Sequence, residues 1–388
     1  MLAIGSQRAL FDVPAGIAYF NTAFSAPLLN AARERLIAAA GAKSRPWERA
    51  PDHFFADAET VRLLAAELFG GEPDGYAVVP AASYGVSSAA RALEPGLRSG
   101  DRILVLDEEF PSNVLPWRRV VLETGASLVT VATPEDQDWT AAALAEIARG
   151  AQVVALAGCH WTNGARLDLE GIGQACRAAG AVLVLDVTQT LGAMPFDMGR
   201  VQPDFLVAAG YKWLLCPYGV GLMYVAERWR EARPLEETWL ARTGASNFSA
   251  LVSYSDQYMP GARRFEVGEK CTALLPGAIA ALEQLKAWGI DDVAASLAEM
   301  NRRIAARLEA LGFRLPPAER RCPHMGGASL PLRYSGDLGG TLRRGNVFVS
   351  QRGSSLRIAP HLHVTEADIV QLSDALEAAL AAPASPRG

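Results

Sequence analysis

Lysine is scarce in this chain. The 37 basic residues comprise 33 arginines and four lysines, which are Lys43, Lys212, Lys270 and Lys286. The formal net charge is −5, whereas a protein that binds nucleic acid needs a basic face for the phosphates. The composition therefore argues against a nucleic-acid partner, while the arginines leave room for local sites that bind small anions.

Cysteines and long apolar runs are scarce as well. No run of about 18 uninterrupted apolar residues is present to cross a membrane, and residues 1–10 lack the charged and apolar pattern of a signal peptide. The cysteines are odd in number and without CxxC spacing, which favours reduced thiols over a disulfide framework or a zinc site. We therefore expect a cytoplasmic protein with no metal site and no membrane contact. The five cysteines are Cys159, Cys176, Cys216, Cys271 and Cys322.

Short apolar runs alternate with amphipathic stretches between residues 75 and 226. The runs are almost continuously hydrophobic, which is typical of strands covered on both faces of a parallel sheet. Helix-like segments lie between them, so the alternation predicts a doubly wound α/β domain. The expected strands are 76–80, 103–106, 128–131, 153–157, 182–186, 205–209 and 221–225, and helices are expected at 84–93, 113–123 and 169–179.

The pattern changes after residue 226. Residues 227–265 show little periodicity, and the helix-like and strand-like segments that follow no longer alternate regularly. This arrangement predicts a smaller α+β domain, followed by a frayed tail at 382–388. The expected elements of the smaller domain are helices at 275–288 and 291–311, strands at 346–350 and 356–359, and a helix from Thr365.

Two of the predicted strands end in residues suited to catalysis. Open α/β sheets bind ligands at the carboxyl ends of their strands, where Asp186 ends the strand at 182–186 and Lys212 follows the strand at 205–209. Lys212 is followed by the apolar residues 213–215. A lysine in an apolar setting has a lowered pKa and is a better nucleophile at neutral pH. The alternatives are a lysine that extends to solvent and an aspartate that caps a turn.

Two further strand ends place candidates at the same edge. Ser83 opens a helix after the strand at 76–80, and His160 and Trp161 follow the strand at 153–157. Pyridoxal phosphate chemistry needs an amine, a carboxylate at the pyridine nitrogen, a helix start for the phosphate and a flat side chain over the ring. This edge offers such a set, although a helix-capping serine and two core aromatics remain the alternative.

Two segments around these residues resemble the class V aminotransferase family of fold type I pyridoxal phosphate enzymes. They are 184–193, which reads VLDVTQTLGA, and 204–214, which reads DFLVAAGYKWL, and 217–224 is also similar. The resemblance implies a large cofactor-binding domain with a seven-stranded, mostly parallel sheet and a smaller α+β domain. It divides the chain into an N-terminal segment (1–20) that packs on the small domain, a large domain (21–260), a small domain (261–381) and a tail (382–388).

The resemblance also implies roles for single residues. Lys212 would hold pyridoxal 5'-phosphate as a Schiff base and would move protons at the Cα of an amino-acid substrate. The remaining roles are Asp186 at the pyridinium nitrogen, Gln189 at the ring hydroxyl, Ala82, Ser83 and Tyr211 at the phosphate, and Trp161 stacked on the ring, with His160 as the alternative.

The resemblance extends into the C-terminal part. Residues 264–268 are similar to a stretch that a second subunit lends to the active site, which implies a homodimer with a site completed near Gly268. Family members often have a phosphate-binding threonine next, but Glu269 stands here and would repel phosphate. Arg357 matches the arginine that binds the substrate carboxylate, with a surface arginine as the alternative.

These motifs do not name the reaction, because fold type I enzymes share early steps and then diverge. Desulfurases of the shorter-loop type have a nucleophilic cysteine three residues after the glycine that Gly353 matches, and Leu356 stands there. A persulfide mechanism is therefore disfavoured. We expect an aminotransferase nearer the kynureninase-like than the desulfurase branch, with a kynureninase-like hydrolase or lyase, an epimerase, or a non-catalytic cofactor-binding sensor as alternatives.

Overall fold

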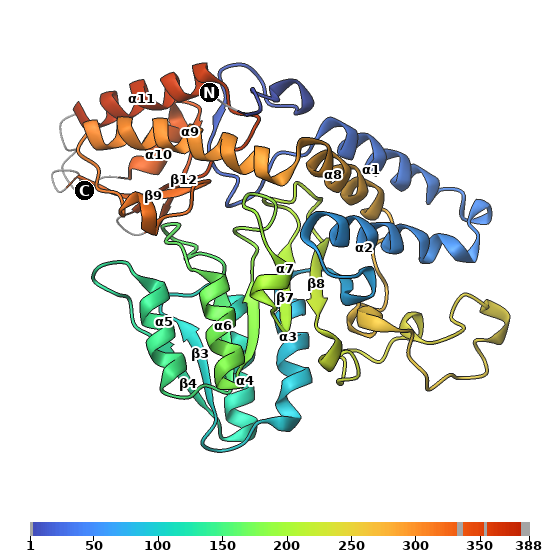
Figure 1. Ribbon diagram of the computed structural model, residues 1–388. Coiled ribbons are helices and arrows are strands. Elements are labelled where there is room, and N and C mark those ends of the chain that lie inside the picture. The colour runs from blue at the N-terminus through green and yellow to red at the C-terminus, as the bar shows by residue number, and fades with distance from the viewer. Residues whose placement is uncertain (1–2, 332–336, 353–354, 382–388) are drawn as a thin grey trace, which may run out of the picture.

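The computed structural model describes residues 3–331, 337–352 and 355–381 (Figure 1). A seven-stranded sheet with the order β2-β8-β7-β6-β5-β3-β4 forms its centre. β8 is antiparallel to β2 and β7, and every other neighbouring pair is parallel. The expected mostly parallel sheet is thus confirmed. Its strands are β2 (Tyr76–Val79), β3 (Arg102–Leu106), β4 (Ser127–Val131), β5 (Val153–Ala157), β6 (Val182–Asp186), β7 (Phe205–Ala209) and β8 (Gly221–Val225).

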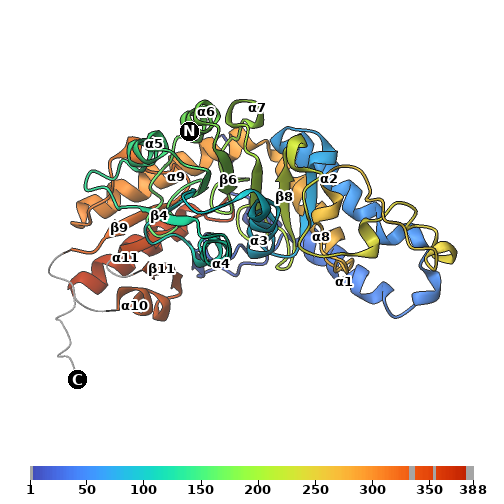
Figure 2. The same ribbon diagram turned by 90° about the horizontal axis from the view of Figure 1, so that it is seen from below.

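Helices cover both faces of this sheet (Figure 2). Every residue of β5, β6, β7 and β8 is buried, which explains why these strands are continuously apolar in the sequence. One face carries α3 (Ala82–Leu93) and α4 (Leu115–Thr124). The other face carries α5 (Trp139–Ala148), α6 (Leu169–Ala179) and α7 (Met198–Val201).

The start of α3 is fixed close to the middle of the sheet. α3 follows β2 after a short turn and packs on β7. Gly85 permits this approach, because a Cβ on Gly85 would lie 2.7 Å from Cγ1 of Val207. The first turn of the helix, with Ala82 and Ser83, is therefore held beside the end of β7.

Residues 210–220 form the connection between β7 and the antiparallel β8. The backbone N–H of Gly210 donates to the carbonyl of Val220 at 2.9 Å, and that of Cys216 donates to the carbonyl of Gly210 at 3.0 Å. Leu215 has a positive φ of 56°, which closes the turn within this connection. Lys212 therefore lies in a loop that backbone hydrogen bonds hold at its base.

A smaller group of elements packs around its own core. Its antiparallel sheet has the order β11-β12-β9, and a parallel pair joins β1 to β10. The one strand expected at 346–350 is two, since the chain pairs first with β1 and then with β12. The elements are β1 (Ala18–Tyr19), β9 (Gly326–Ser329), β10 (Val347–Phe348), β11 (Ser350–Arg352), β12 (Ser355–Ile358), α9 (Ile290–Ala310), α10 (Leu338–Arg344) and α11 (Glu366–Ala381).

The helix α8 (Leu275–Trp288) lies in the range 261–381, which the sequence assigns to the small domain. It packs on α1 (Asn30–Ala42) and α2 (Ala56–Phe69), and its apolar side chains belong to the core on the large sheet. This packing groups α8 with the larger part, and the division at residue 261 stays a prediction. Within the described ranges, none of the helices combines the length and apolar character needed to cross a membrane.

Candidate active site

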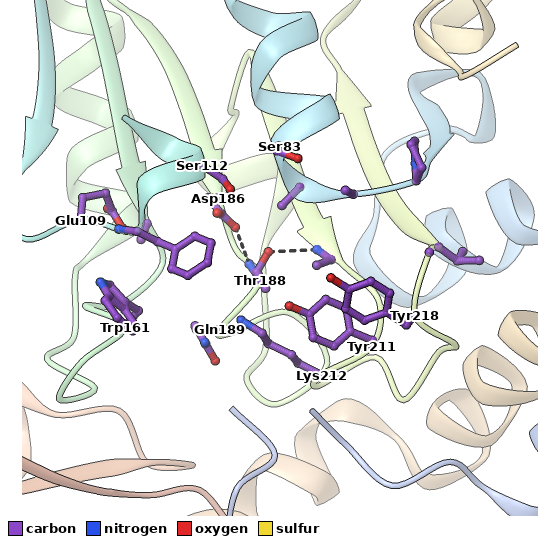
Figure 3. A pocket seen from close by; sticks show the side chains of 18 of the residues that line it. Ser83, Glu109, Ser112, Trp161, Asp186, Thr188, Gln189, Tyr211, Lys212 and Tyr218 are labelled. Atoms are coloured by element: carbon purple, nitrogen blue, oxygen red, sulfur yellow. Dashed lines mark hydrogen bonds between the residues drawn. The ribbon is translucent and has the colours of Figure 1, made fainter. Parts of the chain in front are cut away.

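A cavity of ≈ 180 Å³ lies at the carboxyl ends of the parallel strands (Figure 3). The loops after β3, β5, β6 and β7 line it, together with the start of α3 and the loop that leads into β8. The structure brings most of the predicted cofactor residues together at this one place. They are Ala82, Ser83, Trp161, Asp186, Gln189, Tyr211 and Lys212.

Lys212 projects into this cavity from the loop after β7 (Figure 3). Its Nζ lies 5.5 Å from the ring centroids of Phe110 and Tyr211. Burial lowers the pKa of the amine to about 8, although the nearby Asp186 acts in the opposite direction. At pH 7 about a tenth of such an amine is neutral, roughly 300-fold more than for a lysine with the ordinary pKa. Lys212 is therefore prepared to act as a nucleophile and as a base.

Asp186 lies across the cavity at the end of β6. Its Oδ1 accepts a hydrogen bond from the backbone N–H of Thr188 at 3.0 Å, and Oγ1 of Thr188 accepts one from the backbone N–H of Ala209 at 2.9 Å. Burial raises the pKa of the Asp186 carboxyl, while the bonds from Thr188 and the charge of Lys212 lower it. A cationic group placed in the cavity would favour the charged carboxylate.

The start of α3 forms a wall of the cavity that is suited to an anion. Ala82 and Ser83 occupy the first two positions of the helix, where backbone N–H groups have no partner within the helix and the helix dipole favours negative charge. Tyr211 also lines the cavity, and its ring packs 4.5 Å from that of Tyr218. Sequence analysis did not single out Tyr218, which lies in the loop leading into the antiparallel strand β8.

Gln189 lines the cavity, but both ends of its amide are engaged. Its Nε2 donates to the carbonyl of Ala23 at 3.0 Å, and its Oε1 accepts from Nε1 of Trp213 at 2.9 Å. One amide N–H is left over, because a primary amide has two. A ligand hydroxyl in the cavity would therefore meet a fixed amide group.

His160 and Trp161 are neighbours in the sequence, but only Trp161 lines the cavity. His160 is outside the cavity lining: its ring stacks on Trp139 at 4.8 Å, Nε2 donates to the carbonyl of Asp107, and Nδ1 lies 2.7 Å from Oγ1 of Thr162. Trp161 lines the cavity, and its Nε1 donates to the carbonyl of Glu108 at 2.7 Å. His160 is therefore not placed to stack on a ligand ring.

Phe110 is another aromatic residue of the cavity that sequence analysis missed, besides Tyr218. It follows β3 and lines the cavity, with Nζ of Lys212 5.5 Å from the centroid of its ring. Its ring meets that of Trp161 edge to face at 5.4 Å, and 36% of the residue is exposed. The sequence could have indicated Phe110, because an aromatic residue a few positions after the strand at 103–106 lies at the sheet edge where the other candidate strands end.

Glu109 is a second missed residue of the same loop. Its Oε1 accepts a hydrogen bond from the backbone N–H of Phe110 at 2.7 Å, and its buried Oε2 has no hydrogen-bond partner in the described part of the chain. Burial, with a smaller contribution from the charge of the neighbouring Asp186, raises the pKa of this carboxyl to about 8, although the bond from Phe110 acts in the opposite direction. Glu109 is thus largely protonated at pH 7.

Arg357 and Gly268 lie outside the cavity lining. Arg357 in β12 is 1% exposed, and its Nη1 donates to the carbonyl of Trp161 at 2.7 Å, so it supports the loop that carries Trp161. The backbone N–H of Gly268 donates to Oε2 of Glu236 in the same chain, and Glu269 is exposed. The structure does not bring the stretch near Gly268 to the cavity of its own chain.

Cys159 lines the cavity beside Trp161, whereas sequence analysis counted it among the reduced thiols and gave it no role at the site. The thiol of Cys322 next to it and burial both raise the pKa of the Cys159 thiol well above its ordinary value. Cys159 therefore carries a protonated thiol at neutral pH. Leu356, at the position that a desulfurase nucleophile would take, is completely buried in β12.

This combination of a buried lysine, an opposing carboxylate and a helix start agrees with a comparison against protein families. Residues 21–369 match the family described as aminotransferase class V. The chain belongs to this family. Membership makes it an enzyme that depends on pyridoxal phosphate, as the two segments around Asp186 and Lys212 predict.

The names of class V relatives cover several reactions. A probable cysteine desulfurase of Pyrococcus abyssi is 26% identical over 65% of this chain and 62% of its own length, which is less than two thirds. Isopenicillin N epimerase of Streptomyces clavuligerus is 27% identical over 82% of this chain and 83% of that protein. A kynureninase of Deinococcus radiodurans is 29% identical over 72% of this chain and 68% of that protein. The branch within the family stays a prediction.

A solved structure has the same fold as this chain along nearly the whole length of both proteins. The cysteine desulfurase of Thermococcus onnurineus, in its apo form, has a TM-score of 0.83 with 16% identity and covers 98% of this chain and 99% of that one. Identity at this level supports the fold alone. The predicted fold type I architecture is confirmed.

Proposed function

We propose that this class V enzyme is an aminotransferase that acts at the Cα of an amino-acid substrate. The observation that carries the proposal is the pair of Lys212 and Asp186 in one cavity, with burial lowering the pKa of the lysine amine to about 8. A surface lysine would keep its ordinary pKa and would be protonated at neutral pH. The cavity therefore supplies a base where the family's chemistry needs one.

The cavity residues fit pyridoxal phosphate. The free N–H groups at the start of α3, with Ser83 and Tyr211, suit the phosphate, and the carboxylate of Asp186 suits a protonated ring nitrogen. Phe110, whose ring centroid lies 5.5 Å from Nζ of Lys212, would present the flat side chain to the ring, whereas the sequence predicted Trp161 or His160. When bound, pyridoxal phosphate supplies a conjugated ring that accepts the electron pair left at the substrate Cα.

Lys212 then has two tasks at this site. Its neutral amine would hold the cofactor, and the same amine would accept the proton that leaves the substrate Cα and pass it on, since transamination moves that proton away from Cα. The apolar surroundings limit water, because Phe110, Trp161 and Ala209 contribute to the lining. Exclusion of water strengthens the interaction between Asp186 and a cationic ring nitrogen.

Arg357 is the proposed carboxylate anchor of the substrate. Its guanidinium is buried behind Trp161, and its Nε has no hydrogen-bond partner among the residues described. A planar guanidinium binds a carboxylate with two parallel bonds. With Leu356 at the position of the desulfurase cysteine, transfer of sulfur to that position is disfavoured.

We also propose that the chain works as a homodimer and is cytoplasmic. Gly268 and the exposed Glu269 lie outside the lining of the chain's own cavity, as is expected of a segment that serves a second subunit. All five cysteines are free thiols, which is usual in a reducing compartment. Analytical ultracentrifugation of the holoenzyme at several concentrations tests the dimer, and a monomer at all of them contradicts it.

The experiment that tests the function has two steps. The first compares the visible absorption of the purified wild type with Lys212→Ala and with Lys43→Ala, an exposed lysine directly after α1. We expect the band to disappear in Lys212→Ala alone. The second step mixes the holoenzyme with a panel of amino acids and follows pyridoxamine phosphate, released fragments and Cα stereochemistry separately.

Each outcome of the second step has one meaning. Stoichiometric pyridoxamine phosphate that a keto acid converts back supports the aminotransferase. Released side-chain fragments would indicate a lyase or hydrolase, and racemised substrate would indicate an epimerase, so either contradicts transamination. A holoenzyme that turns over no amino acid would identify a cofactor-binding sensor.

A further inference from the structure

A compact cluster of metal-binding side chains lies behind the wall of the cavity. The Sγ atoms of Cys159 and Cys322 and one ring nitrogen of His324 lie within 4.8 Å of one another. All three residues are buried, with exposed fractions of 0%, 2% and 0%. None of them belongs to the cofactor contacts proposed above. Two sulfurs and an imidazole are the donor set that zinc prefers in proteins.

The hydrogen bonds of His324 leave one nitrogen free for a ligand. Its Nε2 donates to the backbone carbonyl of Gln189 at 2.6 Å, which places the proton of the neutral ring on Nε2. Nδ1 therefore keeps its lone pair, and this atom is buried without a hydrogen-bond partner in the described ranges. Metal-binding histidines have this arrangement, with the second ring nitrogen held by a carbonyl or a carboxylate.

Neighbouring side chains fix the ring of His324. The indole of Trp213 meets it edge to face at 4.5 Å, and Nε1 of Trp213 is bound to Gln189. Gln189 thus holds both rings, one through its side chain and one through its carbonyl. A donor whose orientation is already fixed loses little freedom when it binds a metal.

The chemistry of the cluster suits a divalent cation of intermediate softness. Zn–S and Zn–N bonds of about 2.3 and 2.0 Å place tetrahedral donors roughly 3.5–3.8 Å apart, so small movements from the observed separations suffice. Binding would release one proton from each thiol, and two thiolates with a neutral imidazole would cancel the charge of the ion. A neutral site is compatible with the apolar cluster around Cys159 and Cys322.

We propose that Cys159, Cys322 and His324 bind one Zn²⁺ ion or a cation like it. Three protein donors leave a fourth position for water or a small thiolate. Cys159 also lines the cofactor cavity, which provides a path of entry.

The ion would join two parts of the chain that are far apart in sequence. Cys159 follows β5, whereas Cys322 and His324 precede β9. Two backbone hydrogen bonds already link these segments, from Cys322 N to the carbonyl of Gly164 at 2.7 Å and from Gly327 N to that of Asn163 at 2.8 Å. Zinc would thereby hold the loop of Trp161 against the smaller group of elements, without taking part in proton transfer.

The test measures metal in the full-length holoenzyme, kept reduced with a phosphine. The protein is incubated with Zn²⁺ alone or Co²⁺ alone and dialysed, and metal is then determined by mass spectrometry. We expect one equivalent per chain in the wild type and a loss of binding in Cys159→Ser and Cys322→Ser. Cys176→Ser, which removes a buried thiol in α6, serves as the matched control and should keep the full equivalent. Cobalt should show the strong d–d bands of a tetrahedral thiolate site at longer wavelengths than the cofactor.

A second measurement covers variants that fold poorly. Zinc should raise the melting temperature of the wild type and of Cys176→Ser, but not that of Cys322→Ser, because only a native-state site is stabilised by its ligand. A reduced wild type that binds no zinc, or binding that survives Cys159→Ser, overturns the proposal. A Cys159–Cys322 disulfide in freshly purified protein, with no zinc uptake after reduction, overturns it as well.

Discussion

Lys212 and Phe110 face each other across the cavity, with Nζ 5.5 Å from the centroid of the phenyl ring. The two residues come from loops after β7 and β3, which β6 and β5 separate in the sheet. A flat cofactor attached to Lys212 would therefore lie against Phe110. This relationship makes Phe110 the residue to test first.

Phe110→Ala should weaken cofactor binding by about tenfold, because an aromatic stacking contact contributes roughly 0.5–1.5 kcal/mol beyond its buried area. Titration of the cofactor-free protein, followed by visible absorbance, measures the change. Phe248→Ala, in the exposed segment after β8, is the control and should bind as the wild type does. If Trp161→Ala has the large effect and Phe110→Ala has none, the stacking residue is Trp161.

The rate of covalent attachment of pyridoxal phosphate should follow the protonation of Lys212. Only the neutral amine reacts, and burial lowers the pKa of this amine to about 8. Below that pH the rate should rise about tenfold per pH unit, and above it the rate should level off. Stopped-flow absorbance from pH 6 to 10 records the profile. A rate that continues to rise toward pH 10 would mean that the amine has its ordinary pKa.

Glu109→Gln should stabilise the cofactor-free protein at high pH. Burial raises the pKa of the folded-state carboxyl from 4.5 to about 8, so the neutral form contributes stability that is present below pH 4.5 and is lost as the pH rises toward 8. The glutamine does not ionise, and the difference in unfolding free energy should reach roughly 3–5 kcal/mol at pH 8. Thermal denaturation between pH 4.5 and 8 measures it.

The control for this prediction is Glu123→Gln on the outer side of α4, where the side chain is 36% exposed in a pair with Arg119. An exposed pair contributes about 1 kcal/mol or less, so its pH dependence should stay close to that of the wild type. Equal melting curves for Glu109→Gln and wild type at pH 8 would show that Glu109 ionises normally.

Arg357→Lys should raise the KM for the amino-acid substrate by about tenfold or more and change kcat less. An ammonium group cannot form the two parallel bonds that a guanidinium gives a carboxylate. Steady-state kinetics gives both constants, and the melting temperature shows whether the loss of the bond to the Trp161 carbonyl disturbs folding. Arg343→Lys on α10 is the control. An unchanged KM in a stably folded Arg357→Lys enzyme assigns the carboxylate to another residue.

The sequence predicted those parts of the site that follow directly from buried strands. Asp186 and Lys212 were recognisable because their strands are continuously apolar and end where polar residues begin. The loop after β3 was harder to interpret, since three residues separate Leu106 from Phe110. Side-chain direction within a loop is set by tertiary contacts, so nothing in the pair His160-Trp161 indicated that one side chain packs on Trp139 and the other lines the cavity.

Prediction of the fold from the sequence was limited in the same way, because tertiary contacts decide how the elements pair and pack. The apolar run at 346–350 predicted one strand, because strand propensity does not reveal which partner each residue will pair with. The chain in fact pairs with β1 and then with β12. Long helices such as α8 were located well from periodicity, but the core that α8 joins depends on its contacts with α1 and α2, which lie far away in the sequence.

The antiparallel strand β8 also has a consequence for how loop length can vary in this protein. One hydrogen bond, from the backbone N–H of Gly210 to the carbonyl of Val220, joins the two ends of the loop that carries Lys212, and a Cβ on Gly221 would lie 2.7 Å from the carbonyl oxygen of Ala208. Inserting or deleting a residue there would move the amine relative to Asp186 or shift β8 by one position and turn its side chains to the opposite face. Length changes in the loops after β3 and β5 would leave the lysine in place and would instead move Phe110 and Trp161, which line the cavity.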